Sequence, residues 1–391
     1  MASNAQTESL DARRDRIFGP RTEEHRRFAE DPGIVAYGET WWRDHYDSLS
    51  QLGYTLRPRY NPKWTPPWRG TKRSYKDYEE GQSPVRTVIM DAIRTTDGSY
   101  VTLKKLDMTQ SRSDMAEIEL NKYLSSKKLT ADPRNHCVKV FEIFQLPDEQ
   151  HVYIMAMQSL RPFDDPLFTT IGEAIAFFTQ IFEGLQFLHE HKIAHRDCCS
   201  ANVMMDAAPI YPEPWHPVKL NMRRDWKGKA RHYTRTERPL KYYYIDFGLS
   251  QLYTPENTET WPPLALPVHG GDKTAPENQD EKHNTRCNPF ATDIYYLGNL
   301  IRNSFMQKYY GFGFMEKLVA DMVQDDPSKR PDINEVVSRF AKMRTSLYCW
   351  KLRSRAIPRK EWKILTLWRY PPHILRTIQF TLSHKPAIPG P

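Results

Sequence analysis

The chain has 391 residues, of which 39% are hydrophobic and 27% charged, and its formal net charge is +8. That length suits two domains or two lobes, and the composition is typical of a globular protein. The charged stretch from Met1 to Pro20 lacks the apolar core of a signal peptide, and no run of about 20 apolar residues could span a membrane. We therefore expect an intracellular protein of the cytoplasm or nucleus that is not secreted.

Cysteine usage favours the same compartment. The five cysteines are an odd number and include no Cys-x-x-Cys pair, so neither a disulfide scaffold nor a zinc site is indicated. The adjacent Cys198 and Cys199 could form an oxidation switch. Two small, partly buried thiols are the interpretation that we favour.

Positive charge is concentrated in two segments. Residues 207–241 carry nine basic and three acidic side chains, and residues 341–391 carry eleven and one. The rest of the chain is therefore net acidic. Such segments attract acidic proteins, nucleic acid or anionic lipid. We expect an acidic protein partner rather than nucleic acid, although a solvated surface packed on the acidic core explains the pattern equally well.

Residues 1–80 form an N-terminal extension without a clear period. Trp41-Trp42 and the proline-rich stretch Pro62–Trp68 favour an extended segment that lies against a folded body.

Strands dominate the next part of the chain. Val85–Ile93 and Val101–Leu103 are predicted strands, and Asp97-Gly98 between them is a hairpin signal in which both residues would have positive φ. Met115–Leu124 is a predicted helix, and Val152–Met157 is another strand.

Helices dominate from Thr170 onward. Thr170 and Glu173 have the spacing of a capping box, and the apolar residues that follow recur every three or four positions on one face. Short strands are expected at Asn202–Met205 and Tyr242–Ile245, on either side of the basic insertion 207–241. Strands early and helices late predict an α+β fold with a small, mainly β lobe and a larger, mainly α lobe.

Three motifs carry the candidate chemistry. The first is His195-Arg196-Asp197-Cys198-Cys199-Ser200-Ala201-Asn202, in which an Asp and an Asn five residues apart follow a long helix. Such a loop can aim one oxygen at an attacking hydroxyl and another at a metal ion. The second is Asp246-Phe247-Gly248, whose carboxylate suits Mg²⁺. The third is Ala275-Pro276-Glu277.

Together, and in this order, the motifs resemble those of the eukaryotic protein-kinase family over residues 81–340. The chain also looks like the divergent kinase-like proteins of mushroom-forming fungi. The resemblance implies a bilobal protein-kinase-like fold, with an N-lobe at 81–160, a C-lobe at 161–340 that contains the insertion, and a basic tail at 341–391.

The resemblance implies ATP and Mg²⁺ as cofactors. Asp197 would be the catalytic base, Asn202 and Asp246 would hold Mg²⁺, and Lys104 would neutralise the phosphates. Met157, at the end of its strand, would be among the nucleotide-binding residues.

Lys104 and its partner Glu117 each have a nearby residue of the same type that could take the role instead. Lys105 would point to the opposite face of the strand from Lys104. Glu117 is preferred to Glu119 as the partner of Lys104, because Leu120 is three residues after Glu117 on a packed helix face.

Two further pairs of residues match the family in positions that hold the structure together and take no part in the chemistry. Asp293 would hold the backbone of the His195-Arg196 turn, and Arg330 would pair with Glu277.

The chain departs from the family at three places. The glycines of the phosphate-binding loop would fall at Gln82, Pro84 and Thr87, and none of these is glycine. The lysine of the serine/threonine branch is replaced by Cys199, and the arginine of the tyrosine branch by Ala201. We expect Cys199→Lys to raise the phosphotransfer rate, at small structural cost provided that position 199 faces a solvent-filled cleft.

The third departure is Gly270, where the family usually has a threonine.

Three functions therefore stay open. The first is a protein kinase acting on serine or threonine, and the second is a pseudokinase that binds nucleotide or acts as a scaffold. The third is a small-molecule phosphotransferase, which Ala275-Pro276-Glu277 and Arg330 disfavour.

Overall fold

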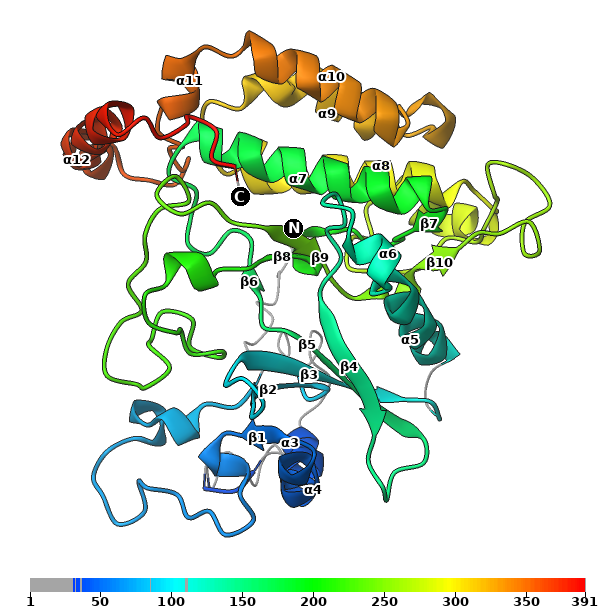
Figure 1. Ribbon diagram of the computed structural model, residues 1–391. Helices are drawn as coiled ribbons and strands as arrows, with labels where there is room; N and C mark the ends of the chain where they lie inside the picture. The colour runs from blue at the N-terminus through cyan, green and yellow to red at the C-terminus, as the bar shows by residue number, and fades with distance from the viewer. Residues whose placement is uncertain (1–30, 32, 36, 85, 110–111, 391) are drawn as a thin grey trace, which may run out of the picture. The chain divides into compact units, whose positions relative to one another are not determined.

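The computed structural model describes residues 31, 33–35, 37–84, 86–109 and 112–390. The chain divides into two compact units, which are coloured by residue number in Figure 1. The first unit contains the described residues up to Lys105 together with Leu146–Asp148 and Trp215–Ala230, and the second contains the remaining segments. Among the described residues, no helix is both long and apolar enough to cross a membrane.

The first unit contains two helices and an antiparallel sheet. The elements are α3 (Tyr37–Asp44), α4 (Tyr46–Gln51), β1 (Tyr54–Leu56), β2 (Ile89–Arg94) and β3 (Tyr100–Asp107). β2 pairs with β1 on one side and with β3 on the other, with Thr55 opposite Ile93 and Lys104 opposite Ile89.

The expectation of an extended segment is wrong at Trp41-Trp42, which lie in α3, whereas Pro62–Trp68 lies in no helix or strand. Trp42 on α3 and Tyr60 after β1 are completely buried. Arg59 is also buried and pairs with Glu39 at 3.1 Å. A buried ion pair and buried aromatic rings make this region part of the core of the first unit. Residues 1–30 lie outside the described residues.

The hairpin between β2 and β3 is confirmed, but its turn differs from the prediction. Gly98 has a φ of 70°, whereas Asp97 is not in the positive-φ region. Asp97 instead accepts a hydrogen bond from the Ser99 amide at 3.0 Å. A single glycine supplies the left-handed residue, so the turn is not the predicted two-residue type. β2 begins at Ile89, and Val85 lies outside the described residues.

The second unit is mainly helical. Its helices are α5 (Arg112–Leu124), α6 (Lys127–Thr130), α7 (Ile171–Glu190), α8 (Pro289–Ile301), α9 (Glu316–Met322), α10 (Ile333–Ser346), α11 (Cys349–Arg353) and α12 (Lys363–Leu382). Its strands are β4 (Val140–Gln145), β5 (Val152–Gln158), β6 (Arg161–Pro162), β7 (Ile193–Ala194), β8 (Val203–Met205), β9 (Tyr242–Tyr244) and β10 (Gln251–Leu252). β4 pairs with β5, β7 pairs with β10, and β8 lies between β6 and β9, all antiparallel.

Helix α7 is the centre of the second unit, with α10 beside it in Figure 1. Thr170 caps the helix as predicted, because the Glu173 amide donates to Thr170 Oγ1 at 3.1 Å. The reciprocal bond differs from a capping box, because the Glu173 carboxylate accepts from the amide of Thr169, one residue before the cap, at 2.8 Å. Phe182 of α7 packs edge-on against Phe340 of α10. The strands and helices together confirm the α+β class. The boundaries of the four predicted segments stay a prediction, and α10 continues past residue 341 to Ser346.

Candidate functional site

The loop after β7 is held by a single buried carboxylate. Asp293 on α8 is completely buried and accepts the backbone N–H groups of His195 at 2.8 Å and Arg196 at 2.7 Å. Arg196 has a φ of 65°, a conformation that costs energy in a non-glycine residue. Two charge-assisted hydrogen bonds stabilise it, as expected for Asp293 from the sequence.

The carboxylate of Asp197 is fixed from both sides. Its Oδ2 accepts a hydrogen bond from Asn202 Nδ2 at 2.8 Å, and the same amide donates to the Asp197 carbonyl at 2.9 Å. Its Oδ1 accepts from the Gly271 amide at 2.8 Å. Because Asn202 spends its N–H₂ group on Asp197, its Oδ1 is the atom that can serve as an acceptor or metal ligand.

The Gly270-Gly271 pair lies directly on the loop His195–Asn202, the candidate catalytic loop. A methyl group built on Gly270 would come within 2.3 Å of Asp197 Oδ1, and one built on Gly271 within 2.7 Å of Cys199 Sγ. Only glycine allows the backbone to approach this closely. The sequence analysis did not identify Gly271 as a site residue, although two successive glycines in this segment were a signal for close approach.

The expectation that position 199 faces a solvent-filled cleft is wrong. Cys199 is only 7% exposed, and the backbone at Gly271 covers its sulfur. A lysine would have to displace that backbone, so the missing cation cannot be restored by this substitution alone. Burial raises the pKa of Cys199 to about 11, and burial likewise raises the pKa of Cys198. Both thiols therefore stay protonated, which argues against a reactive oxidation switch.

Burial also raises the pKa of Asp197 above its ordinary value, although the hydrogen bond from Gly271 opposes the shift. A carboxylate with a raised pKa is a stronger proton acceptor than an exposed aspartate.

The Asp246-Phe247-Gly248 turn lies next to the catalytic loop. The Ile245 amide donates to the Asn202 carbonyl at 3.0 Å, which brings Asp246 to the end of the loop. Asp246 has a φ of 63°, a left-handed conformation that Asp tolerates better than most residues. A methyl group on Gly248 would lie 3.1 Å from Glu117 Oε2 and 3.6 Å from Asp246 Oδ1, so the two carboxylates flank this glycine.

The donors in this region fit Mg²⁺. Asn202 offers an amide oxygen and Asp246 a carboxylate, and hard oxygen donors are what Mg²⁺ prefers. Among the described residues, no group of three or more His, Cys, Asp and Glu side chains could hold a metal ion. Two protein ligands are nevertheless enough for Mg²⁺, which usually takes the others from substrate phosphates and water.

The remaining site residues are placed as follows. Glu117 is buried on α5 whereas Glu119 is exposed, which agrees with the choice of Glu117. Lys104 is half-buried in β3, and the next residue, Lys105, lies with its Nζ 5.0 Å from the centre of the Trp41 ring. Met157 is buried near the end of β5. The ion pair between Lys104 and Glu117 stays a prediction.

The predicted pair between Arg330 and Glu277 is confirmed. The two side chains form a bidentate ion pair at 2.7 and 2.8 Å, and the Thr292 hydroxyl also donates to the Glu277 carboxylate. Burial alone would raise the pKa of Glu277, but Arg330 outweighs it and holds the pKa below its ordinary value. The segment that carries Gly270 and Gly271 is thereby fixed at its C-terminal end.

The place of the glycine-rich loop is taken by a long connection. β1 and β2 are paired neighbours, and residues 57–88 join them. Arg57 at the start of this connection donates to Asp91 on β2 at 3.1 Å and to the Gln82 carbonyl at 2.8 Å. The Arg57 side chain therefore ties this connection to β2 and to Gln82, one of the positions at which the family's loop has glycine.

The middle of the basic insertion belongs to the first unit. Within that unit, Arg224 donates to Asp91 at 2.6 Å, and Trp226 Nε1 donates to the Asp77 carbonyl at 2.8 Å. Asp91 therefore joins two arginines that are far apart in the sequence. Part of the charge of the insertion is neutralised in this way.

Comparison with known protein families matches residues 85–308, more than half of the chain, to the protein kinase domain. Among curated proteins, the chain is similar to the Serine/threonine-protein kinase CAK1 of Saccharomyces cerevisiae, with 25% identity over 44% of this chain and 39% of that protein. It is also similar to Mitogen-activated protein kinase kinase 8 of Arabidopsis thaliana, with 29% identity over 30% of this chain and 35% of that protein. These alignments cover less than two thirds of each relative's length.

Proposed function

Since the chain belongs to the protein kinase family, we propose that it transfers the γ-phosphoryl group of ATP to serine or threonine hydroxyls of proteins. Membership confirms the resemblance and the bilobal, α+β protein-kinase-like fold expected from the sequence. The observation that carries the proposal is the Asp197 carboxylate, which Asn202 and Gly271 hold in a fixed orientation.

In this proposal the oxygen of the substrate hydroxyl attacks the γ-phosphorus atom. Asp197 orients that hydroxyl or accepts its proton during the attack. The carboxylate keeps lone pairs on both oxygens beside the hydrogen bonds from Asn202 and Gly271. Fixing the acceptor in advance saves the cost of ordering it in the transition state.

Nucleotide and metal are assigned to the residues that match the family. Asn202 and Asp246 would hold Mg²⁺, Lys104 would contact the phosphates with Glu117 as its partner, and Met157 would be among the nucleotide-binding residues. Bound Mg²⁺–ATP supplies the transferable phosphoryl group and the neutralising metal charge.

The preference for serine and threonine rests on the relatives. The yeast relative is named a serine/threonine-protein kinase, and so is par-4 of Caenorhabditis elegans, at 30% identity over 17% of this chain and 12% of that protein. The residues that separate the two branches of the family, Cys199 and Ala201 here, favour neither.

A pseudokinase that binds nucleotide or serves as a scaffold is the second candidate. The specific observation in its favour is that the backbone at Gly271 occupies the space next to Cys199, where a lysine would otherwise lie. Without that lysine one fixed cation is missing from the transition state, and losing one such contact slows an enzyme by about 10²–10³-fold.

Binding and autophosphorylation of the full chain with Mg²⁺–ATP test the proposal, with Asp197→Asn as the control. The substitution keeps the shape of the side chain but removes the carboxylate. We expect wild-type incorporation of phosphate and an Asp197→Asn variant that binds nucleotide without transferring it. Binding by both proteins with no transfer by either would establish the pseudokinase, and failure to bind any nucleotide would refute both candidates.

A negatively charged partner for the two basic segments is part of the proposal. Because Arg224 already pairs with Asp91, the tail from residue 341 carries more of the charge available to a partner. An acidic protein is the partner expected from the sequence.

The five cysteines are all unpaired, which supports a reducing compartment such as the cytoplasm or nucleus.

A further inference from the structure

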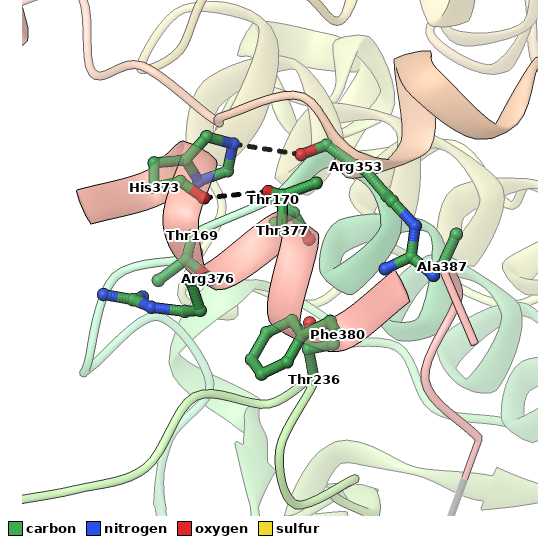
Figure 2. Close-up of a pocket in the computed structure, with 9 residues that line it drawn as sticks. All are labelled: Thr169, Thr170, Thr236, Arg353, His373, Arg376, Thr377, Phe380 and Ala387. Carbon is green, nitrogen blue, oxygen red and sulfur yellow. Dashed lines mark hydrogen bonds between the residues drawn. The ribbon is translucent and has the colours of Figure 1, made fainter. Parts of the chain in front are cut away.

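Helix α12 packs against the second unit through its polar face. The inward residues His373, Arg376 and Thr377 line a small cavity together with Thr169 and Thr170, as Figure 2 shows. His373 Nε2 lies 3.1 Å from the Arg353 carbonyl, in hydrogen-bonding distance. Only Phe380 on this side of the helix is a buried apolar side chain.

The outward face of α12 is apolar. Its large residues are each between 51% and 77% exposed and lie in two groups on one side of the helix, before and after the Pro371-Pro372 pair: Ile364, Leu367 and Trp368, then Ile374, Leu375, Ile378 and Leu382. A surface helix normally has the opposite arrangement, with its apolar stripe toward the core. A continuous apolar face of this kind marks a site of interaction with a protein or a membrane.

The position of the helix is fixed by the segment before it. Leu352 on α11 and Ala356 are buried, and the Ala356 amide donates to the Thr169 carbonyl at 3.0 Å. After the helix, the Ala387 carbonyl lies so close to Gly172 of α7 that a methyl group there would come within 1.8 Å of it. Both ends of the tail are therefore anchored, and α12 lies at the periphery of the second unit (Figure 1).

The charge around this face is positive. The tail from residue 341 has eleven basic side chains and one acid, Glu361. That acid already pairs with Arg355 at 2.6 Å and with Arg369 at 3.0 Å. On α12 itself Arg369 is neutralised by Glu361 and Arg376 lies on the inward side, but no acidic residue follows Glu361 in the chain, so Lys363 and the tail as a whole keep an excess of positive charge.

The occupant of this face must therefore accept both an apolar surface and positive charge. A second copy of the chain brings the same positive charge and is repelled. An anionic lipid bilayer offers an apolar layer for the leucine, isoleucine and tryptophan side chains, and negative headgroups for the lysines and arginines. Tryptophan, which α12 and the residue before it both present, favours the boundary between these layers.

We propose that α12 is a membrane-surface anchor that lies in the headgroup region of an anionic bilayer with its apolar face toward the acyl chains. A helix lying in the plane of the interface does not span the membrane, in keeping with the described helices. The proposal is independent of the proposed phosphotransfer, because none of its residues belongs to the catalytic loop.

Sedimentation of the full chain with lipid vesicles tests the proposal. The vesicles contain phosphatidylcholine alone or phosphatidylcholine with phosphatidylserine, and the variant is Leu367→Asn/Leu375→Asn. Leu264→Asn/Leu266→Asn is the matched control, because these two leucines are also about half exposed, at 52% and 49%, but lie outside the tail. Thermal unfolding of each protein establishes that it is folded.

We expect the wild type and the control to sediment with the phosphatidylserine vesicles only. The Leu367→Asn/Leu375→Asn variant should bind at least about tenfold more weakly, the ratio expected when the burial of one leucine side chain is lost. Added salt should release the wild type, since it screens the attraction to the headgroups.

Several outcomes would overturn the proposal. A folded wild type that stays in the supernatant has no anionic membrane anchor. Equal binding of the wild type and the variant places the binding surface elsewhere. If polyglutamate binds in a Leu367- and Leu375-dependent manner and vesicles do not, the face takes an acidic protein. Leucine-dependent dimerisation without vesicle binding identifies a second copy as the occupant.

Discussion

Replacing Gly270 by alanine should disable the candidate base while leaving the protein folded. The added methyl group would lie 2.3 Å from Asp197 Oδ1, 2.6 Å from its Cγ and 3.1 Å from its Cβ. Carbon atoms of side chains essentially never come within 3.0 Å of such neighbours, so the methyl group and Oδ1 must separate by at least 0.7 Å. Gly270 does not have a positive φ, so alanine meets no backbone strain and the effect is purely steric.

The easiest relief is a movement of the carboxylate itself. Such a movement weakens the hydrogen bonds that Asp197 accepts from Asn202 and Gly271, both of which are 2.8 Å long. A displacement approaching 1 Å at a reacting group costs about 10²-fold in rate. The cost in folding free energy should be only about 1–3 kcal/mol, as for other overpacked sites.

Two measurements check this prediction. Single-turnover phosphotransfer at saturating Mg²⁺–ATP should fall about 10²-fold in Gly270→Ala, with nucleotide affinity unchanged. Hydrogen exchange of the Gly271 amide should become faster, and this measurement is informative even if the wild type is a pseudokinase. Gly313→Ala is the control, because a methyl group at Gly313 meets nothing within 4 Å. A Gly270→Ala variant with wild-type rate and wild-type amide exchange would refute the reasoning.

Three further predictions concern the metal, the core of the first unit and pH. Asp246→Asn should abolish the Mg²⁺ dependence of nucleotide affinity with little change in thermal midpoint, and equal wild-type affinity with and without Mg²⁺ would contradict this assignment. Asp91→Asn should cost about 3 kcal/mol in urea unfolding because it removes the carboxylate shared by the buried Arg57 and the half-buried Arg224, whereas Asp97→Asn on the exposed turn should leave the unfolding midpoint nearly unchanged. Burial lowers the pKa of His136 to about 4, so this imidazole binds a proton more strongly in the unfolded chain than in the folded one. The free energy of unfolding should therefore fall by about 3 kcal/mol as the pH drops from the ordinary pKa of histidine to about 4. A His136→Asn variant should lose that slope, and an unchanged slope would show that another group is responsible.

The sequence by itself determined the parts of the protein that depend on short-range spacing. The helix cap at Thr170 and the hairpin at Gly98 follow from local hydrogen bonding and backbone preference, although the turn type did not. The order of the three motifs identified the family, and with it the contacts of Asp293 with the catalytic loop and of Arg330 with Glu277. Both contacts could be predicted because the family's motifs specify the residue on each side of the contact.

Only the tertiary structure decided which distant segments meet. Arg59 is buried in the core of the first unit because Glu39 on α3 neutralises it, a pairing that no local pattern predicts, and Trp42 of the same helix is also buried there. Gly271 reached Asp197 because a segment more than seventy residues further along the chain folds back over the catalytic loop. The apolar residues of α12 could be read from the sequence as one helical face. Whether that face points inward or outward depends on what the opposite face packs against, and such packing is a long-range property of the folded chain.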